Sequence, residues 1–319
     1  RLIITADCGT GSAEAIRTAR QAGIDTIVTD HHPATEPPGA AVAVVNPALA
    51  RDGAGLAHLA GVGVAYYLAI ALRAYLRRQG FWKNRREPNL KRLCDLVAVG
   101  TVADVAPLIA ENRVLTGAGL QLLGADPRPG MSALMRLSGA ADMPVDAETI
   151  AFKLAPRLNA AGRLVHARMA CELLMTGNPQ KAARLAAALC RLNDRRRVLE
   201  TQLLNLIEDR LSNRPDLADG PALVVHGDRW HEGLLGIVAS RLTPRFNRPA
   251  LVISTKNGMG KGSGRSVEGI DLAAALRQCD DLLDRCGGHP LAAGFALPSA
   301  DITAFTTRLQ AAVARLQAD

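Results

Sequence analysis

Two histidines stand side by side at the end of a short apolar run, in the string TIVTDHHP at residues 26–33. Asp30 precedes them, and two further aspartates, Asp7 and Asp104, also follow apolar runs. Carboxylates combined with imidazole suit a divalent cation such as manganese, whereas structural zinc sites usually include thiolates. The chemistry that fits is phosphoryl transfer, because two metal ions about 3.5–4 Å apart can bind both the attacking and the leaving oxygen.

The two adjacent histidines, His31 and His32, are not expected to act alike. If their side chains diverge at a strand end, they cannot both bind one ion. We therefore expect one metal ligand and one group that orients or exchanges a proton. The competing interpretation takes each aspartate as a helix cap or turn residue and each histidine as a surface or core residue. Three acids at strand ends, together with a histidine pair, favour the metal site.

The first 30 residues predict the elements that position these groups. An apolar strand at 2–6 is followed by a helix that Ser12 opens and Gly23 closes, and then by a second strand at 25–29. Such a crossover makes neighbouring strands parallel, and open α/β sheets bind ligands at the carboxyl ends of their strands. We therefore expect the acids that follow these strands to face a shared site.

A third apolar run, DLVAVGTVADVAPL at 95–108, is predicted to bring Asp104 to the same edge from the end of another strand. A short strand is expected at 42–45 and an apolar helix at 61–78. Helical patterns fill residues 111–212. Helices are therefore expected on the faces of the sheet.

The chain of 319 residues is too long for one ordinary core, and a new α/β pattern begins after the turn-rich string NRPDLADGP. We predict an α/β fold in which a parallel-sheet domain is joined by a long helix to a smaller α/β domain. The predicted bounds are 1–188 for the first domain, 189–214 for the connecting helix and 215–319 for the second domain.

Two motifs combine arginine with small residues and can supply phosphate ligands. They are PRLNAAGR at 156–163 and GKGSGRS at 260–266, and we predict that the second forms a flexible hairpin. Arginine can bind phosphate through two parallel hydrogen bonds. The glycine-rich motif lacks the Walker spacing, and an ordinary hairpin turn is its alternative interpretation. The side chains that can contact phosphate are Arg157, Arg163, Lys261, Arg265 and Ser266.

The formal charge of +8 favours a polyanionic partner such as nucleic acid, because lysine and arginine displace counterions from phosphates. A solubilising surface charge is the alternative. The basic stretch at 73–92 is interpreted either as a surface that tracks a strand or as a solvated helix end. Aromatic residues make up only 3%, which argues against a binding surface made mainly of stacking platforms.

The six cysteines are scattered without a C-x-x-C pair, which indicates neither a zinc ribbon nor a disulfide framework. A reducing cytoplasm fits this usage. No apolar run reaches the roughly 18–20 residues that span a bilayer, and no signal peptide precedes the first strand. A hydrophobic content of 48% with 21% charged residues supports a sizeable core and excludes global disorder.

Taken together, these motifs resemble the DHH phosphoesterase family, and in particular its exonucleases that digest single strands from the 5′ to the 3′ end. The matching strings follow the family order across essentially the whole chain. They are LIITADCG, VTDHHP, DLVAVGTVADVAPLIAENR, PRLNAAGR, LNDRRRVLE, HEGLLGIVASRL, GRSVEGIDL and GGHPLAAGF.

The resemblance implies a dinuclear manganese or magnesium site with Asp7, His31 and Asp104 as ligands. It also implies that Asp30 and His32 act beside the metals as catalytic or substrate-contacting groups. The second domain would be the DHH-associated domain. The residues that would hold the DNA backbone or its 5′ phosphate between the two domains are Arg157, Asn159, Arg163, Arg265, Ser266, Gly287, Gly288 and His289.

The function that the resemblance implies is metal-dependent hydrolysis of single-stranded DNA from the 5′ end, in DNA repair and recombination. Single-strand-binding protein and a helicase would be partners. Two parts of the family pattern are absent from this chain: an Asp-x-Asp motif upstream of position 1 and an oligonucleotide-binding barrel after the last helix. We therefore expect the chain by itself to have an incomplete metal shell.

Two other functions stay open. A DHH phosphodiesterase for short oligonucleotides or cyclic dinucleotides would keep the metal site, but it would not need the basic stretch or the motifs after residue 150. A non-catalytic replication scaffold would be expected to lose the acids and histidines, and all of them are present.

Overall fold

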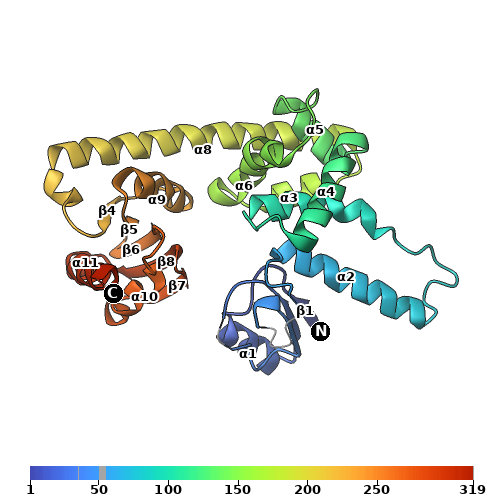
Figure 1. Cartoon of the computed structure of the whole chain (residues 1–319), viewed down its shortest axis with the longest axis horizontal. Helices are drawn as coiled ribbons and strands as arrows, with labels where there is room; N and C mark the ends of the chain where they lie inside the picture. Colours follow the sequence, from blue (N-terminus) through green and yellow to red (C-terminus); the bar gives the residue numbers. More distant parts are fainter. Residues whose placement is uncertain (35, 50–54, 319) are drawn as a thin grey trace. The chain divides into compact units, whose positions relative to one another are not determined.

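The chain begins with a parallel three-stranded sheet in the computed structural model, which describes residues 1–34, 36–49 and 55–318. The strands run in the order β1-β2-β3, with Leu2 opposite Asp25 and Ile27 opposite Ala43. The predicted crossover and its parallel strands are thereby confirmed (Figure 1). Its elements are β1 (Leu2–Ile4), α1 (Ala13–Gln21), β2 (Asp25–Thr29) and β3 (Ala43–Val45).

The chain folds into two compact units. The first contains residues 1–159 and 169–190, and the second contains residues 160–168 and 191–319. The first unit holds the parallel sheet and most of the helices. Its helices, including three that also contain residues of the second unit, are α2 (Gly61–Arg78), α3 (Cys94–Ala103), α4 (Ala110–Ala125), α5 (Pro129–Leu137), α6 (Ala155–Leu164), α7 (Arg168–Met175) and α8 (Pro179–Asn213).

The prediction that Asp104 ends a strand is wrong, because the apolar run before it forms the helix α3. Asp104 follows the last residue of α3, and its backbone N–H bonds to the carbonyl of Gly100 at 3.0 Å. This helix is apolar on nearly all sides because α2 and α4 both pack against it. A short apolar run of this kind cannot be distinguished from a buried strand by its periodicity.

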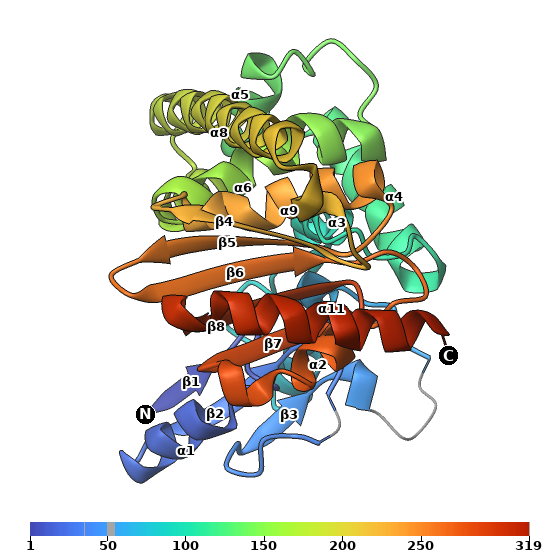
Figure 2. The same cartoon turned by 90° about the vertical axis from the view of Figure 1, so that its left-hand side faces the viewer.

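The second unit is built on a mixed five-stranded sheet in the order β4-β5-β6-β8-β7. Strands β4 and β5 are parallel, and the remaining pairs are antiparallel. The strands and their flanking helices can be followed in Figure 2. They are β4 (Leu223–Asp228), α9 (Glu232–Phe246), β5 (Ala250–Lys256), β6 (Met259–Arg265), α10 (Leu272–Arg277), β7 (Arg285–His289), β8 (Ala292–Pro298) and α11 (Ile302–Ala318).

The glycine-rich motif predicted as a flexible hairpin is instead the regular strand β6, paired with β5 on one side and β8 on the other. The hairpin turn lies before it, at Asn257 and Gly258, both with φ in the left-handed region. Glycine in a strand weakens its intrinsic preference, but it also lets other groups approach the sheet closely. Pairing on both sides therefore determines the conformation of this motif.

Both faces of this sheet are covered, which explains the uninterrupted apolar string of β5. Leu251 and Ile253 pack with Phe305 of α11 in one hydrophobic cluster. Ala250 and Val252 pack on the other face, in a cluster formed by α9 and the last turns of α8. Alternate residues of a strand point to opposite faces, so each face receives its own core.

Among the described residues, no helix is both long and apolar enough to cross a membrane.

Candidate functional site

The carboxyl ends of β1 and β2 bring together the first two predicted metal ligands. Asp7 comes shortly after β1, and its backbone N–H donates to the carbonyl of Thr29 at the end of β2, at 3.0 Å. Its φ of 63° lies in the left-handed region, which is strained for a residue with a side chain. His31 follows β2 by two residues. The parallel pairing therefore sets the aspartate beside the histidine.

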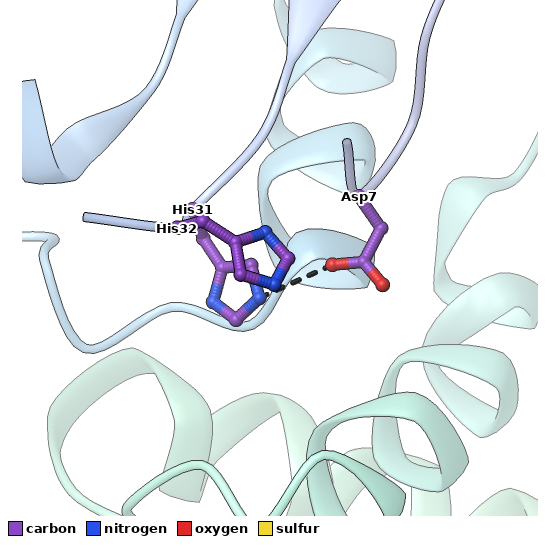
Figure 3. Close-up of side chains that lie close together, drawn as sticks. All are labelled: Asp7, His31 and His32. Carbon is purple, nitrogen blue, oxygen red and sulfur yellow. Dashed lines mark ion pairs between the residues drawn. The ribbon is translucent and has the colours of Figure 1, made fainter. Parts of the chain in front are cut away.

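His31 is the centre of the cluster. Its Nε2 atom lies 3.1 Å from Asp7 Oδ1 and 3.6 Å from Asp104 Oδ2. A ring nitrogen of His32 also lies within 4.8 Å of the ligand atoms of Asp7 and His31. Figure 3 shows the two imidazole rings next to each other beside the Asp7 carboxylate. The structure therefore brings together every predicted ligand, from β1, β2 and α3.

The two histidine rings do not diverge. The prediction that they have different roles assumed that they would. Their centroids are 4.6 Å apart, with an angle of 58° between the ring planes. The reason is that Asp30 holds the ring of His32, since its Oδ1 lies 2.7 Å from His32 Nδ1. An ionised carboxylate only accepts hydrogen bonds, so Nδ1 carries a proton, and in the neutral ring Nε2 is then the acceptor.

Asp30 is an anchor for the whole edge and is only 1% exposed. Its Oδ2 accepts from Thr10 N at 3.0 Å, and its Oδ1 accepts from His31 N at 2.8 Å and from His32 N at 3.3 Å. Burial alone would raise the pKa of Asp30, but these hydrogen bonds together with the His32 ring outweigh it and lower the pKa strongly. Asp30 is therefore ionised and fixed.

The electrostatics of the other groups reflect crowded carboxylates. The Asp7 carboxylate is the main cause that raises the pKa of His31, and Asp104 and Asp30 add to it. Burial raises the pKa of Asp104, and the negative charge of Asp7 acts in the same direction. The buried Nε2 atom of His31 has no hydrogen bond of good geometry despite the nearby Asp7 oxygen. A divalent cation relieves this situation, since it takes imidazole and carboxylate ligands together.

Several positioning residues were not predicted from the sequence. Asn46, directly after β3, donates from Nδ2 to Thr10 Oγ1 at 3.0 Å and to the His32 carbonyl at 2.9 Å. Asn112 is fully buried in α4 and donates to the carbonyls of His58 and Pro107, at 2.7 and 3.0 Å. The signal for Asn46 was available, because it follows a parallel strand at the same sheet edge. Nothing in the sequence indicated Asn112.

Helix α2 begins directly against the site. A Cβ atom added at Gly61, its first residue, would lie 2.1 Å from Asp7 Oδ1. Any side chain at this position would therefore displace the carboxylate. His58, just before the helix, lies 2.9 Å from Glu111 Oε2 through its Nε2 atom. His58 is thus held close to the start of α2, where Gly61 leaves room for Asp7.

The second unit contains a cluster of guanidinium groups, which we call the arginine cluster, formed by Arg163, Arg196 and Arg265. Desolvation lowers the pKa of Arg163, and the positive charges of Arg196 and Arg265 lower it further. The nearby carboxylate is that of Glu200, which lies 3.2 Å from Arg196 Nη1 and also accepts from Arg241. Positive charges therefore outnumber the carboxylate, which suits an anionic ligand.

Helix α9 makes room for this cluster. A Cβ atom at Gly236 would lie 2.9 Å from Ser263 Oγ and 3.0 Å from Arg265 Nη2. Arg265 at the end of β6 donates to the carbonyl of Gly264 at 2.8 Å, and desolvation lowers its pKa. Ser263 was not among the predicted residues, although it lies two positions before Arg265 on the same strand. Period-two spacing on β6 was the signal that could have indicated it.

The other predicted substrate ligands have different surroundings. Arg157 Nη1 donates to Lys153 O within its own helical segment at 2.5 Å, whereas Asn159 is exposed. Ser266 Oγ donates to the carbonyl of Ile270 at 2.8 Å, so this hydroxyl supports a turn. Gly287, Gly288 and His289 lie on the exposed strand β7, paired with β8. Their assignment as substrate ligands stays a prediction.

The basic stretch at 73–92 is partly neutralised. Glu87 lies 3.4 Å from Arg73 through Oε1 and also binds Arg77, while Arg92 pairs with Asp126 at 3.0 Å. The remaining cations of the stretch are exposed, so both interpretations given above remain compatible with its geometry.

Comparison with known proteins matches both units to one family. The family model described as the DHH family, N-terminal domain, matches residues 1–101, and the DHHA1 domain matches residues 219–315. The single-stranded-DNA-specific exonuclease RecJ of Dickeya dadantii is 42% identical over 308 residues, which cover 93% of this chain and 53% of the relative. The chain thus spans about half the length of the curated relatives that it matches.

Two solved structures are similar over nearly all of the chain. RecJ from Thermus thermophilus in complex with Mn²⁺ is 38% identical, with a TM-score of 0.83, and the match covers 98% of this chain and 45% of that chain. An exonuclease RecJ bound to manganese is also 38% identical, with a TM-score of 0.77, and the match covers 98% of this chain and 75% of that one.

Proposed function

Because the chain belongs to the DHH family and, within it, to the RecJ exonucleases, we propose that it hydrolyses single-stranded DNA from the 5′ end with Mn²⁺ or Mg²⁺ as cofactor. The observation that carries the proposal is the convergence of Asp7, His31 and Asp104 at one sheet edge. The buried, unbonded Nε2 atom of His31 between two carboxylates fits a metal ligand.

The residues of this chain would have the following roles. Asp7, His31 and Asp104 hold the divalent ions, which when bound polarise the phosphate and activate a water for attack. Asp30 fixes the tautomer of His32, so that its bare Nε2 can serve as a further ligand or accept a proton. The His32 side chain is 54% exposed and can therefore reach a substrate.

We assign the 5′ phosphate of the strand to the arginine cluster, with Arg163 and Arg265 as its main ligands. Arginine is suited to this role because its planar group donates two parallel hydrogen bonds to phosphate. The excess of positive charge over carboxylate supports the assignment. Arg265→Gln should therefore reduce any preference for strands with a 5′ phosphate over strands with a 5′ hydroxyl. The exposed Arg197, replaced by glutamine in the same way, is the control.

The proposal extends to organisation and context. We propose a DHH domain at 1–188, a connecting helix at 189–214 and a DHH-associated domain at 215–319; the two matched ranges, 1–101 and 219–315, lie within the first and the last of these. Single-strand-binding protein and a helicase are the partners that such an activity calls for, in DNA repair and recombination. The six free thiols fit a reducing cytoplasm.

The test is manganese-dependent degradation of single-stranded DNA by the full-length gene product, with substrates blocked at the 5′ or at the 3′ end. Loss of long strands only when the 5′ end is free is the expected result. Digestion from the 3′ end would refute the proposed polarity. Cleavage confined to very short oligonucleotides would instead support a small-substrate phosphodiesterase.

The His31→Ala variant tests the metal site itself. Turnover should fall by more than the roughly 10- to 100-fold that loss of an outer-shell partner causes, because a direct ligand is removed. Saturating Mn²⁺ should stabilise the wild-type protein against heat but not this variant. His226→Ala, an exposed histidine on β4, is the matched control. Unchanged turnover in His31→Ala would remove the ligand assignment.

A further inference from the structure

A cavity of about 630 Å³ lies at the carboxyl ends of β4 and β5 in the second unit. Its walls come from residues 162–165, the turn 229–233 and the end of β5 at Ser254 and Lys256. The two strands are parallel, and α9 begins just after β4, so this is the edge at which open α/β sheets bind ligands. The volume falls in the range of small-molecule sites.

The cavity has an excess of positive charge. Arg163, Arg229 and Lys256 line it, and Glu232 is the acidic residue in its wall. The Oε2 atom of Glu232 lies 2.9 Å from Lys261 Nζ, in a pair whose side chains are each about half exposed. In the part of the chain that the structure describes, no carboxylate pairs with Lys256. Three cations and one partly paired carboxylate leave an excess of positive charge, which suits a phosphate group.

Arg229 is held in place by the backbone. Its φ of 54° lies in the left-handed region, and its backbone N–H donates to the Thr255 carbonyl at 2.8 Å. Its nearest carboxylate is the adjacent Asp228 at 3.7 Å, and both side chains are about three-quarters exposed. An exposed pair of this kind contributes little. The guanidinium is therefore free to bind an anion in the cavity.

Trp230 supplies an aromatic surface in the same cavity. A Cβ atom at Gly227 would lie 2.2 Å from its ring, so the indole lies directly against the backbone of β4. Ser254 Oγ donates to the Trp230 carbonyl at 2.7 Å and fixes the position of the residue. A tryptophan held in this way is a stacking surface that any nucleobase can use.

We propose that this cavity binds one nucleotide of a DNA strand, with its phosphate on Arg229 and Lys256 and its base on Trp230. That the nucleotide belongs to a DNA strand rests on the proposed function. The cavity shares only Arg163 with the arginine cluster, so a strand whose end lies there can place a neighbouring nucleotide here. The site is a nucleobase contact in addition to the phosphate contacts already assigned.

The first experiment uses Trp82→Phe, which leaves Trp230 as the only tryptophan of the two in the chain. Single-stranded oligonucleotides are added without divalent metal, so that no hydrolysis occurs, and binding is followed by fluorescence anisotropy of a labelled strand. The expected result is quenching of tryptophan emission by a strand with bases and none by an abasic strand. Binding without quenching would overturn the proposal. A free mononucleotide that quenches tryptophan emission as strongly as a strand does would also overturn it.

The second experiment measures affinity. Trp230→Leu should weaken binding of a strand with bases about 5- to 150-fold and leave an abasic strand unaffected. Arg229→Gln with Lys256→Gln should lower the slope of log K against log salt by about 0.7 for each phosphate that the variant no longer neutralises. Arg17→Gln with Arg20→Gln removes the same charge from exposed positions of α1 and is the control.

A slope equal to that of the control would overturn the phosphate assignment. The double variant changes only exposed side chains, so it remains informative if Trp230→Leu fails to fold. All binding assays are free of metal and of hydrolysis. Quenching together with absent nuclease activity would therefore refute the proposed function alone, whereas nuclease activity without quenching would refute the cavity alone.

Discussion

Replacement of Asp30 by asparagine should damage both the stability of the sheet edge and the metal site. The change keeps the shape of the side chain but turns one carboxylate oxygen into a donor. Asp30 now accepts from Thr10 N through one oxygen, and from His31 N, His32 N and the His32 ring through the other. In either orientation, the NH2 group of the asparagine faces at least one buried donor that Asp30 now accepts from.

The structure indicates which orientation costs less. With the amide nitrogen toward Thr10, one buried N–H loses its acceptor, whereas the reverse orientation leaves the donors of both histidines without one. An unsatisfied buried donor costs about 1–3 kcal/mol, and hydrogen bonds to a charged group contribute about 1 kcal/mol more than neutral ones. One unsatisfied donor at Thr10 and three weakened hydrogen bonds to the other oxygen give an expected loss of about 4–6 kcal/mol, a large part of the stability of a typical domain.

The protonation of Asp30 itself should not change the loss between about pH 5 and pH 8. A carboxyl whose pKa is lowered in the folded state contributes stability above its unfolded pKa of about 3.9, and this contribution is lost as pH falls through the folded pKa. The pKa of Asp30 is lowered strongly, so the wild-type side chain stays ionised over the whole interval. The titration of Asp30 therefore adds no pH dependence there, but its charge also raises the pKa of His31. The difference between wild type and variant should therefore decrease as pH rises through the pKa of His31.

The assay is urea denaturation together with hydrogen exchange of the Thr10 and His31 amides. The Thr10 amide, which loses its acceptor, should exchange faster in Asp30→Asn, and Mn²⁺ affinity should fall about 10- to 100-fold because a neutral amide oxygen holds the His32 ring less firmly than the carboxylate does. Asp25→Asn is the matched control, since Asp25 is an exposed residue at the start of the same strand. A change in stability below about 0.5 kcal/mol, with unchanged exchange at Thr10, would refute the anchoring role of Asp30.

Gly61→Ala should weaken Mn²⁺ binding and activity, because the added Cβ atom meets the Asp7 carboxylate, whereas Gly117→Ala in an open position of α4 should stabilise the protein by about 0.5–1 kcal/mol. Metal titration and thermal denaturation of both variants measure this contrast, and equal metal affinity would contradict it. Arg128→Met should cost about 3–5 kcal/mol, since it leaves the buried Asp95 without its bidentate partner. Denaturation at neutral pH measures the cost, and a loss below about 1 kcal/mol would contradict it.

Local patterns in the sequence were sufficient where one short segment determines the geometry. The crossover around the strand at Asp25–Thr29 and the helix at Gly61–Arg78 were predicted with these bounds or close to them. A crossover between parallel strands places the residues that follow them at one edge. The proximity of Asp7 and His31 could therefore be expected from the sequence alone.

The two wrong predictions of secondary structure concern segments whose conformation depends on packing against several neighbouring elements. The run before Asp104 is apolar on nearly every side, so its periodicity could not separate helix from strand. The glycine-rich segment Met259–Arg265 has few side chains to indicate a strand, yet pairing on both sides makes it one. Neither partner strand can be identified from the segment itself.

The positioning residues were missed for a different reason. Asn112 acts because its amide joins the carbonyls of His58 and Pro107, which are distant from each other in sequence. Gly61 and Gly236 act through the side chain that they lack, since a Cβ atom would displace Asp7 or Arg265. A single sequence carries no signal for either effect, because both depend on which backbone lies opposite.

In each unit a glycine leaves space in which charged side chains come together, and the two resulting sites have opposite charge. In the first, the glycine at the start of α2 lets carboxylates and imidazoles meet at the end of parallel strands, and the resulting crowding of negative charge favours a cation. In the second, Gly236 on α9 admits Arg265 beside two other guanidiniums, and the excess of positive charge favours an anion. The proposed function needs both, because metal-assisted hydrolysis of a phosphodiester requires a carboxylate-rich centre that would repel DNA unless arginines elsewhere bind its phosphates.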